Sequence, residues 1–138
     1  MKLPAFVSSQ VQQARRYFLD LHPKESGPLS PVCGGCERVS PDYLIARDDF
    51  PFHCIEFVAE GEGEVTLNNH RRPLFPGCVF AYGPGIAHRI RTSPQKPMLK
   101  YYVDFAGAGA SEALEAAGLN RFNTLFVSPP EEIVAVFE

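Results

Sequence analysis

Short runs of alternating apolar and polar residues, separated by turn-forming residues, fill the central part of the chain. This two-residue period is typical of strands that bury one face. The predicted strands are Asp42–Arg47, Cys54–Ala59, Glu64–Leu67, Arg71–Phe75, Cys78–Tyr82, Ala87–Thr92 and Leu99–Phe105. Because the strands are short and turns separate them, the pattern predicts a mainly β fold of the sandwich or barrel type.

The pattern changes at both ends of the chain. Residues 1–30 fit an amphipathic helix and a strand equally well, and residues 22–31 are predicted to be a loop because prolines interrupt them. Beyond Gly107, a segment rich in alanine, glutamate and leucine predicts a helix over Ser111–Ala117. Gly118 follows at the position of a helix-ending glycine.

A second helix is predicted from residue 129 onward. Ser128 stands at the N-cap position, Pro129 at the first helical position and Glu131 at the capping-box position. Since no stop signal precedes Glu138, we expect the chain to be a piece of a longer protein. The expected organisation is an N-terminal lead-in arm over 1–30, a β-barrel over 31–107 and a C-terminal helical segment over 108–138 that is cut before a further domain.

Composition narrows the class of protein. Hydrophobic residues make up 45% of the 138 residues, and 11 Phe and 5 Tyr are among them, which excludes a disordered chain. The apolar runs are too short to span a membrane, and no secretory signal opens the chain. Four cysteines without an export signal are expected to be reduced thiols of a cytoplasmic protein.

Basic residues concentrate in one block although the net charge is −3. Residues 71–100 contain arginines and lysines and no acidic residue, a pattern that can indicate nucleic-acid binding. These residues fall on alternating strand positions and in turns, so we expect that they cannot all share one face. The block therefore predicts surface charge plus one or two pocket residues, and we expect no direct DNA contact from it.

The stretch from Gly77 to His88 resembles the second motif of the cupin superfamily, through Gly77, Gly83, Gly85 and His88. Residues 57–65 resemble the end of the first cupin motif. The resemblance implies a cupin-type double-stranded β-helix, a jelly-roll barrel, followed by the C-terminal helices. Metal-binding cupins hold their ion with two histidines and a glutamate of the first motif and the histidine of the second.

The positions that match those metal ligands are Asp48, Phe50, Cys54 and His88. Phe50 cannot bind a metal, and the remaining set is chemically mixed. The resemblance therefore gives no metal site, no cofactor and no catalytic residue, and we expect that the chain is not an enzyme. A small cupin enzyme, either a metal-dependent oxygenase or a sugar isomerase, remains the alternative.

A fuller resemblance, over roughly residues 30–138, is to the N-terminal effector-binding and dimerisation domain of AraC/XylS-type transcriptional regulators. The segments that carry it are Gly34–Glu37, Tyr43–Asp48, Ile55–Val58, the Gly61–Gly63 turn, Gly77–His88 and Lys100–Phe105. The resemblance implies a small-molecule effector, expected to be a carbohydrate such as a sugar or sugar acid, and a homodimer formed through the C-terminal helices. It also implies that DNA is bound only by a helix-turn-helix domain absent from this chain.

The resemblance and strand parity together select the candidate ligand-binding residues. The family's ligand-gripping arginine matches Arg47, and other family positions match Ile90, Lys100 and Tyr102. If Cys54 faces the interior, parity places further polar side chains there as well. The full candidate set is Arg47, Glu56, His88, Ile90, Lys100, Tyr102 and Asp104.

Two interpretations of this polar interior stay open. In one, the side chains form a pocket for a polyhydroxylated ligand. In the other they form an internal ion-pair network without a ligand, for example Arg47–Glu56 and Lys100–Asp104, and the chain is only a dimerisation module. In the first interpretation, residues 22–31 are a candidate for the loop that orders over the barrel mouth.

Overall fold

A computed structural model describes residues 4–23, 27–119, 122–128 and 130–138. Its elements are β1 (Val11–Phe18), β2 (Ser30–Val39), β3 (Leu44–Arg47), β4 (His53–Glu60), β5 (Gly63–Leu67), β6 (His70–Leu74), β7 (Cys78–Tyr82), β8 (His88–Thr92), β9 (Leu99–Ala106), α1 (Ala110–Ala116), β10 (Leu125–Phe126) and α2 (Pro130–Phe137). The mainly β fold class predicted from the alternation is confirmed.

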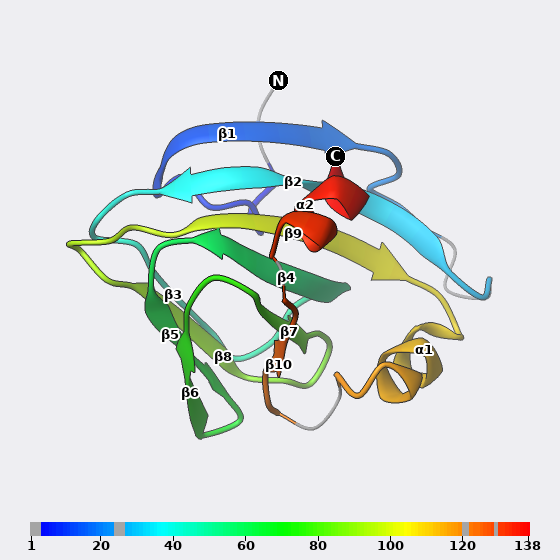
Figure 1. The fold of residues 1–138 in the computed structure, drawn as a ribbon. Helices are drawn as coiled ribbons and strands as arrows, with labels where there is room; N and C mark the ends of the chain where they lie inside the picture. The colour runs from blue at the N-terminus through cyan, green and yellow to red at the C-terminus, as the bar shows by residue number, and fades with distance from the viewer. Residues whose placement is uncertain (1–3, 24–26, 120–121, 129) are drawn as a thin grey trace.

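The strands form two antiparallel sheets that face each other (Figure 1). The larger sheet has the order β1-β2-β9-β4-β7-β10, and the smaller sheet has the order β3-β8-β5-β6. Apolar residues of both sheets meet in one buried cluster, including Val58 and Phe80 from the larger sheet and Val65 and Ile90 from the smaller. The barrel interior is therefore a packed core, and any binding site must lie at its polar part.

The seven predicted strands are present, and β7 has the predicted bounds Cys78–Tyr82. The ambiguous segment 1–30 contains strand β1, which pairs with β2 at the edge of the larger sheet. The predicted loop 22–31 gives its last two residues to β2, and residues 24–26 lie outside the described part of the chain. Strands β2 and β10 were not predicted, and β2 turns out to be central to the site.

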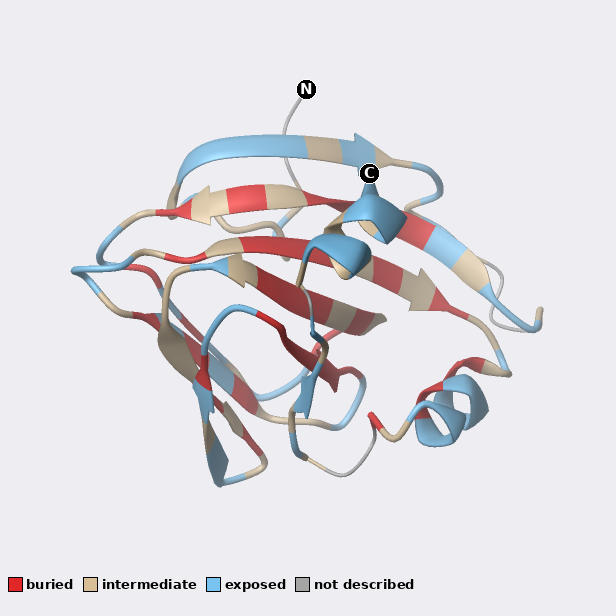
Figure 2. Cartoon of the chain, viewed as in Figure 1, coloured by how far each residue is buried: buried red, intermediate tan, exposed pale blue. Residues whose placement is uncertain are grey.

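Strand parity is confirmed on β4 and β9. Glu56 and Lys100 are buried inside the barrel, whereas Phe57 and Tyr101 face the opposite side of the larger sheet. Figure 2 shows long buried stretches along the strands of this sheet. There the ring of Phe137, at the end of α2, stacks on Phe57 at 6.4 Å between ring centroids. One face of the sheet thus lines the polar interior, while the other packs against a helix.

Both predicted helices are present, displaced by about one residue. Helix α1 spans Ala110–Ala116, and α2 begins at Pro130, after Pro129, which lies outside the described residues together with the capping geometry expected for it. Among the residues described, no helix is long and apolar enough to cross a membrane.

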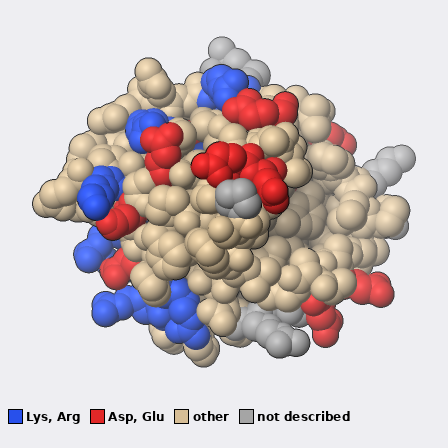
Figure 3. Space-filling model, viewed as in Figure 1, with Lys and Arg blue, Asp and Glu red and all other residues tan. Residues whose placement is uncertain are grey.

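The basic block does not share a single face. Arg71 and Arg89 both lie opposite Thr66 on the outer side of the smaller sheet, whereas Lys100 is buried in the barrel. Glu64 lies 3.3 Å from Arg91 and 3.8 Å from Arg71. Figure 3 shows basic and acidic side chains side by side on the face in view. The expectation that the basic residues cannot all share one face is confirmed, because Lys100 is buried.

Candidate functional site

The polar interior is built by register across three neighbouring strands. In the ladder, Glu37 of β2 lies opposite Lys100 of β9, and Tyr102 of β9 lies opposite Glu56 of β4. Asp104 lies two residues further along the same face of β9. The register thus brings three charged residues of the predicted set, Glu56, Lys100 and Asp104, together with Glu37. The prediction did not include Glu37.

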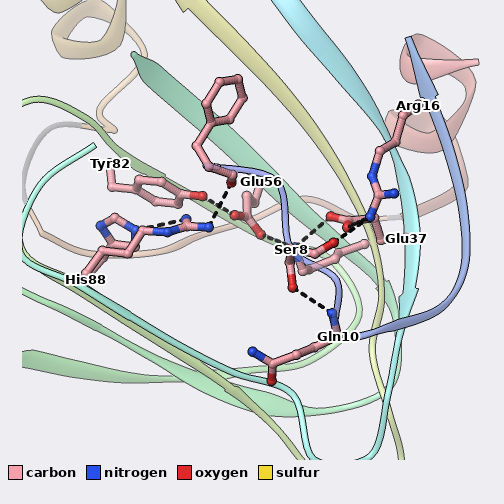
Figure 4. A network of polar contacts seen from close by, with 10 residues as sticks. Ser8, Gln10, Arg16, Glu37, Glu56, Tyr82 and His88 are labelled. Atoms are coloured by element: carbon pink, nitrogen blue, oxygen red, sulfur yellow. Dashed lines mark hydrogen bonds and ion pairs between the residues drawn. The ribbon is translucent and has the colours of Figure 1, made fainter. Parts of the chain in front are cut away.

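Lys100 is the centre of the charge network. Its Nζ lies 2.9 Å from Glu56 Oε1 and 3.5 Å from Glu37 Oε1, and only 2% of the lysine side chain is exposed. Tyr82 donates a hydrogen bond to Glu56 Oε2, and Arg16 of β1 donates one to Glu37 Oε2 at 2.9 Å (Figure 4). Burial opposes the charged form, but the two carboxylates outweigh it and raise the pKa of Lys100 well above its usual value.

Arg47, the predicted ligand-gripping residue, ends β3 at the mouth of the barrel. Its Nη2 donates to the carbonyl oxygen of Phe6 at 2.9 Å, and its Nη1 lies 3.4 Å from Nε2 of His88. The guanidinium also lies 5.1 Å from the centroid of the Phe50 ring. The suggested pairs Arg47–Glu56 and Lys100–Asp104 are wrong, because β2 supplies a second carboxylate that register places opposite the lysine.

His88 contacts the side chains of both Arg47 and Tyr82. Its ring stacks on Tyr82 at 3.9 Å between centroids, and Nδ1 donates to the carbonyl of Ile86 at 3.2 Å, so Nε2 is the acceptor for Arg47. Burial lowers the pKa of His88, and the charge of Arg47 lowers it further. The imidazole is therefore neutral at pH 7. Ile90 is fully buried in the apolar cluster and does not line the cavity.

Two buried oxygen atoms of the interior have neither a hydrogen-bond nor an ion-pair partner within the described part of the chain: Tyr102 Oη and Asp104 Oδ1. The other carboxylate oxygen of Asp104 accepts a hydrogen bond from the thiol of Cys33 at 3.2 Å. Buried polar atoms without partners are rare, so these two indicate contacts to water or to a ligand. Burial raises the pKa of Asp104 to about 6, although the neighbouring thiols of Cys54 and Cys33 oppose the shift.

This shift predicts a pH dependence. Between about pH 4 and 6 the folded protein retains the Asp104 proton that the unfolded chain loses, so the stability contributed by this group is full below pH 4 and is lost as the pH rises through 6. We expect D104N to gain about 2–3 kcal/mol relative to the wild type between pH 4 and pH 7. Urea denaturation of both proteins at the two pH values measures this. A pH-independent difference between D104N and the wild type would contradict the assignment.

A cavity of about 30 Å³ lies between the network and the N-terminal segment. It is lined by Phe6, Val7, Ser8, Glu37, Tyr43, Arg47, Phe50, Glu56, Tyr82, Lys100, Tyr102 and Asp104. Five of the seven predicted site residues thus surround one space. Its aromatic walls and charged groups are suited to bind a small polar molecule. The residues 22–31 do not line it, and Gly27 and Pro28 instead accept hydrogen bonds from Ala108 and Gly109 ahead of α1.

The residues at the cupin metal positions do not fit a metal ion. No group of three or more His, Cys, Asp or Glu residues capable of holding one is present in the described ranges. His88, the one matching histidine, presents Nε2 to the guanidinium of Arg47 at 3.4 Å, where a second cation would be repelled. Phe50 packs edge-on against Tyr82 and His88 in the place of a ligand.

Sequence reasoning missed the residues contributed by β1, β2 and the segment before β1. Glu37 belongs to a segment that carried the family resemblance, but without a recognised strand its parity could not be assigned. Arg16 lies on an edge strand of ambiguous period. Tyr43 and Tyr82 lie in predicted strands, and the same inward parity could have identified Tyr82.

The family described as the AraC-like ligand binding domain matches residues 35–138. The chain belongs to this family. The matched AraC-like region contains every candidate ligand-binding residue, from Arg47 to Asp104, while β1 and Arg16 lie outside it.

A curated relative of this AraC-like domain is the Msm operon regulatory protein of Streptococcus mutans serotype c, with 27% identity over 88 residues. The match covers 62% of this chain and 31% of that protein, so the chain spans about a third of its relative's length. Two solved structures share the fold. They are YhaK from Escherichia coli (TM-score 0.58, 15% identity, 86% of this chain and 53% of that one) and salicylate 1,2-dioxygenase from Pseudaminobacter salicylatoxidans (TM-score 0.53, 18% identity, 89% and 32%). The cupin-type barrel and the AraC-type resemblance are confirmed.

Proposed function

We propose that this AraC-like domain senses a small polyhydroxylated metabolite, a sugar or sugar acid, bound in the barrel interior. The observation that carries the proposal is the pair of buried, unpartnered oxygen atoms, Tyr102 Oη and Asp104 Oδ1, at a cavity that Arg47 also lines. The ammonium of Lys100 has carboxylate partners in Glu37 and Glu56. Within the described residues, these two oxygens have no partner, and neither does Nε of Arg16 at the edge of the network.

The chemistry of the lining residues suits sugar hydroxyl groups. Each hydroxyl donates one hydrogen bond and accepts others, so it can bridge a carboxylate such as Asp104 and a donor such as Arg47. The rings of Tyr43, Phe50 and Tyr82 supply flat apolar surface for the C–H faces of a sugar ring. A ligand bound between these groups would complete hydrogen bonds that the protein leaves open.

The proposal extends to the rest of the protein. We expect the C-terminal helices to form a homodimer and the bound effector to change how a helix-turn-helix domain outside this chain is presented to DNA. In this proposal the domain binds its ligand without converting it.

A thermal-shift screen tests the proposal, using monosaccharides, disaccharides, sugar acids and polyols with and without EDTA. A ligand at a hundred times its dissociation constant stabilises by about 2.7 kcal/mol, which raises the melting temperature by about 5–10 °C. A rise that EDTA does not change supports a metal-free sensor. A fall in melting temperature caused by EDTA alone would support the alternative of a metal-dependent cupin enzyme. If no compound in the panel changes the melting temperature, the result would favour a dimerisation module without a ligand.

Replacing Arg47 should remove the response. We expect R47A to remain folded, because its guanidinium bonds only a backbone carbonyl and a neutral histidine, and to lose the ligand-induced rise in melting temperature. R38A is the matched control, since Arg38 pairs with Glu60 on the outside of the sheet. Unchanged ligand affinity in R47A would contradict the pocket assignment.

A further inference from the structure

The segment Phe6–Ser8 lies across the mouth of the barrel. All three of its residues line the cavity, which is left with about 30 Å³. This volume holds about two water molecules, whereas pockets for small ligands usually measure several hundred Å³. No sugar fits while the segment is in place, so ligand binding and this position of the segment exclude each other.

The segment is bound by Arg47, which the ligand is proposed to use, and by Arg16 of the charge network. Arg47 donates to the carbonyl of Phe6 at 2.9 Å, and Arg16 donates to the carbonyl of Ser8 at 2.8 Å. The ring of Phe6 packs edge-on against Phe50 at 5.8 Å and against Phe52 at 5.3 Å between centroids. The segment thus supplies two backbone carbonyl acceptors and the aromatic ring of Phe6. We expect an effector for this site to offer similar features.

The two arginines differ in their other partners. Arg16 is also bound to the carboxylate of Glu37 at 2.9 Å, and Glu37 in turn contacts Lys100. Arg47 has no carboxylate within 4 Å in the described part of the chain, so a neutral carbonyl is its best acceptor. A carboxylate would bind a guanidinium more strongly than a carbonyl does. The contact between Arg47 and Phe6 is therefore the one that an acidic ligand displaces most readily.

We propose that Phe6–Ser8 is an internal occupant of the effector site and that the effector competes with it, taking over the hydrogen bond of Arg47. This inference rests on the proposed function and adds a direction to it: the N-terminal segment leaves the barrel when ligand binds. The affinity for ligand is reduced by the fraction of molecules in which the segment is bound, so weakening the segment raises the apparent affinity. The displaced end continues directly into β1, which carries Arg16.

A single introduced tryptophan reports the segment, because the chain has no native Trp. In F6W we expect blue-shifted emission and protection from acrylamide, and in F6W/R47Q we expect a red shift and loss of that protection. F6W/R38Q is the control and should behave like F6W, since Arg38 lies on the outer side of β2 and pairs with Glu60. Equal emission in F6W and F6W/R47Q would overturn the proposal.

Hydrogen exchange on the protein that retains Phe6 also tests whether Arg47 holds the segment in place. It avoids the introduced tryptophan, which is larger than phenylalanine. Amides of residues 6–10 should exchange more slowly in the wild type than in R47Q, while R38Q leaves them unchanged. Equal exchange in wild type and R47Q would count against the proposal even if F6W disturbed the segment by itself.

Two probes that differ in one group then test the competition in F6W. D-galacturonate carries a carboxylate where D-galactose carries a hydroxymethyl group, and we expect galacturonate to cause a saturable red shift of the tryptophan emission at lower concentration than galactose. A probe that raises the melting temperature while the introduced indole becomes more protected would overturn the inference and leave the proposed function standing. Release of the indole by R47Q, with no sugar raising the melting temperature, would support the internal occupant and count against a sugar effector.

Discussion

Replacing Lys100 with methionine is expected to lower the free energy of unfolding by about 3–5 kcal/mol. The substitution keeps an unbranched side chain one atom shorter but leaves Glu37 and Glu56 buried without their shared cation. Uncompensated buried charge is among the few causes of such large losses. For a chain of this size, the loss corresponds to a fall in melting temperature of about 10–15 °C. Urea denaturation at pH 7 and thermal melts measure both quantities.

A matched control separates burial from loss of charge. Lys96 pairs with Glu62 at 3.3 Å, but the two side chains are 69% and 44% exposed, so K96M should cost less than about 1 kcal/mol. Adding E56Q to K100M should recover part of the stability, because Glu56 is the carboxylate that loses in K100M the only cation it has among the described residues. A loss in K100M no greater than in K96M would contradict the charge network described here.

The same network explains how the proposed ligand site can remain folded without a ligand. Arg16, Glu37, Lys100 and Glu56 balance in charge and pair with one another, so the barrel tolerates their burial. Asp104 and Tyr102 stand outside that balance, with oxygen atoms left unpartnered in the described region. The polar groups of the charge network and those proposed to contact the ligand are therefore neighbours on one strand, β9, but differ in their partners.

The elements with a clear period were predictable from the sequence, and the others were not. The central strands follow the alternation because one face of each is buried against the core. Strand β2 begins with Ser30-Pro31 and contains Gly34-Gly35, which weaken any local preference for a strand. It forms because β1 and β9 supply hydrogen-bond partners on both sides, a condition that only the assembled sheet provides.

The candidate site divides in the same way. Parity on β4 and β9 predicted that Glu56, Lys100, Tyr102 and Asp104 share the interior, and the structure places them there. Their pairing depends on the register between strands and on the inclusion of β2, so the choice of Glu37 as a partner of Lys100 could not be predicted. The position of Phe6–Ser8 depends on hydrogen bonds from Arg47 at the end of β3 and from Arg16 of β1. It could not be predicted because these contacts form only in the assembled fold.

Alanine at Gly61 is expected to cost about 4 kcal/mol, whereas alanine at Gly85 should cost about 1–2 kcal/mol. Both glycines have a left-handed backbone, with φ of 81° and 80°, so both substitutions carry the same conformational penalty. The difference comes from their surroundings. A Cβ on Gly61 would overlap the carbonyl oxygen of Pro97 and lie 2.7 Å from the Cα of Met98, while nothing lies within 4 Å of a Cβ on Gly85.

The contacts at Gly61 are backbone atoms that hold the hairpin turn against the loop before β9, where Glu62 donates to the carbonyl of Lys96 and accepts from Ser93. Relieving the overlap therefore requires separation of two chain segments, which adds about 1–3 kcal/mol to the conformational penalty. Equilibrium urea unfolding of G61A and G85A measures the difference directly. Equal losses would mean that the turn can move away from Pro97, and the cupin-motif glycine at 61 would then be required by its backbone angle alone.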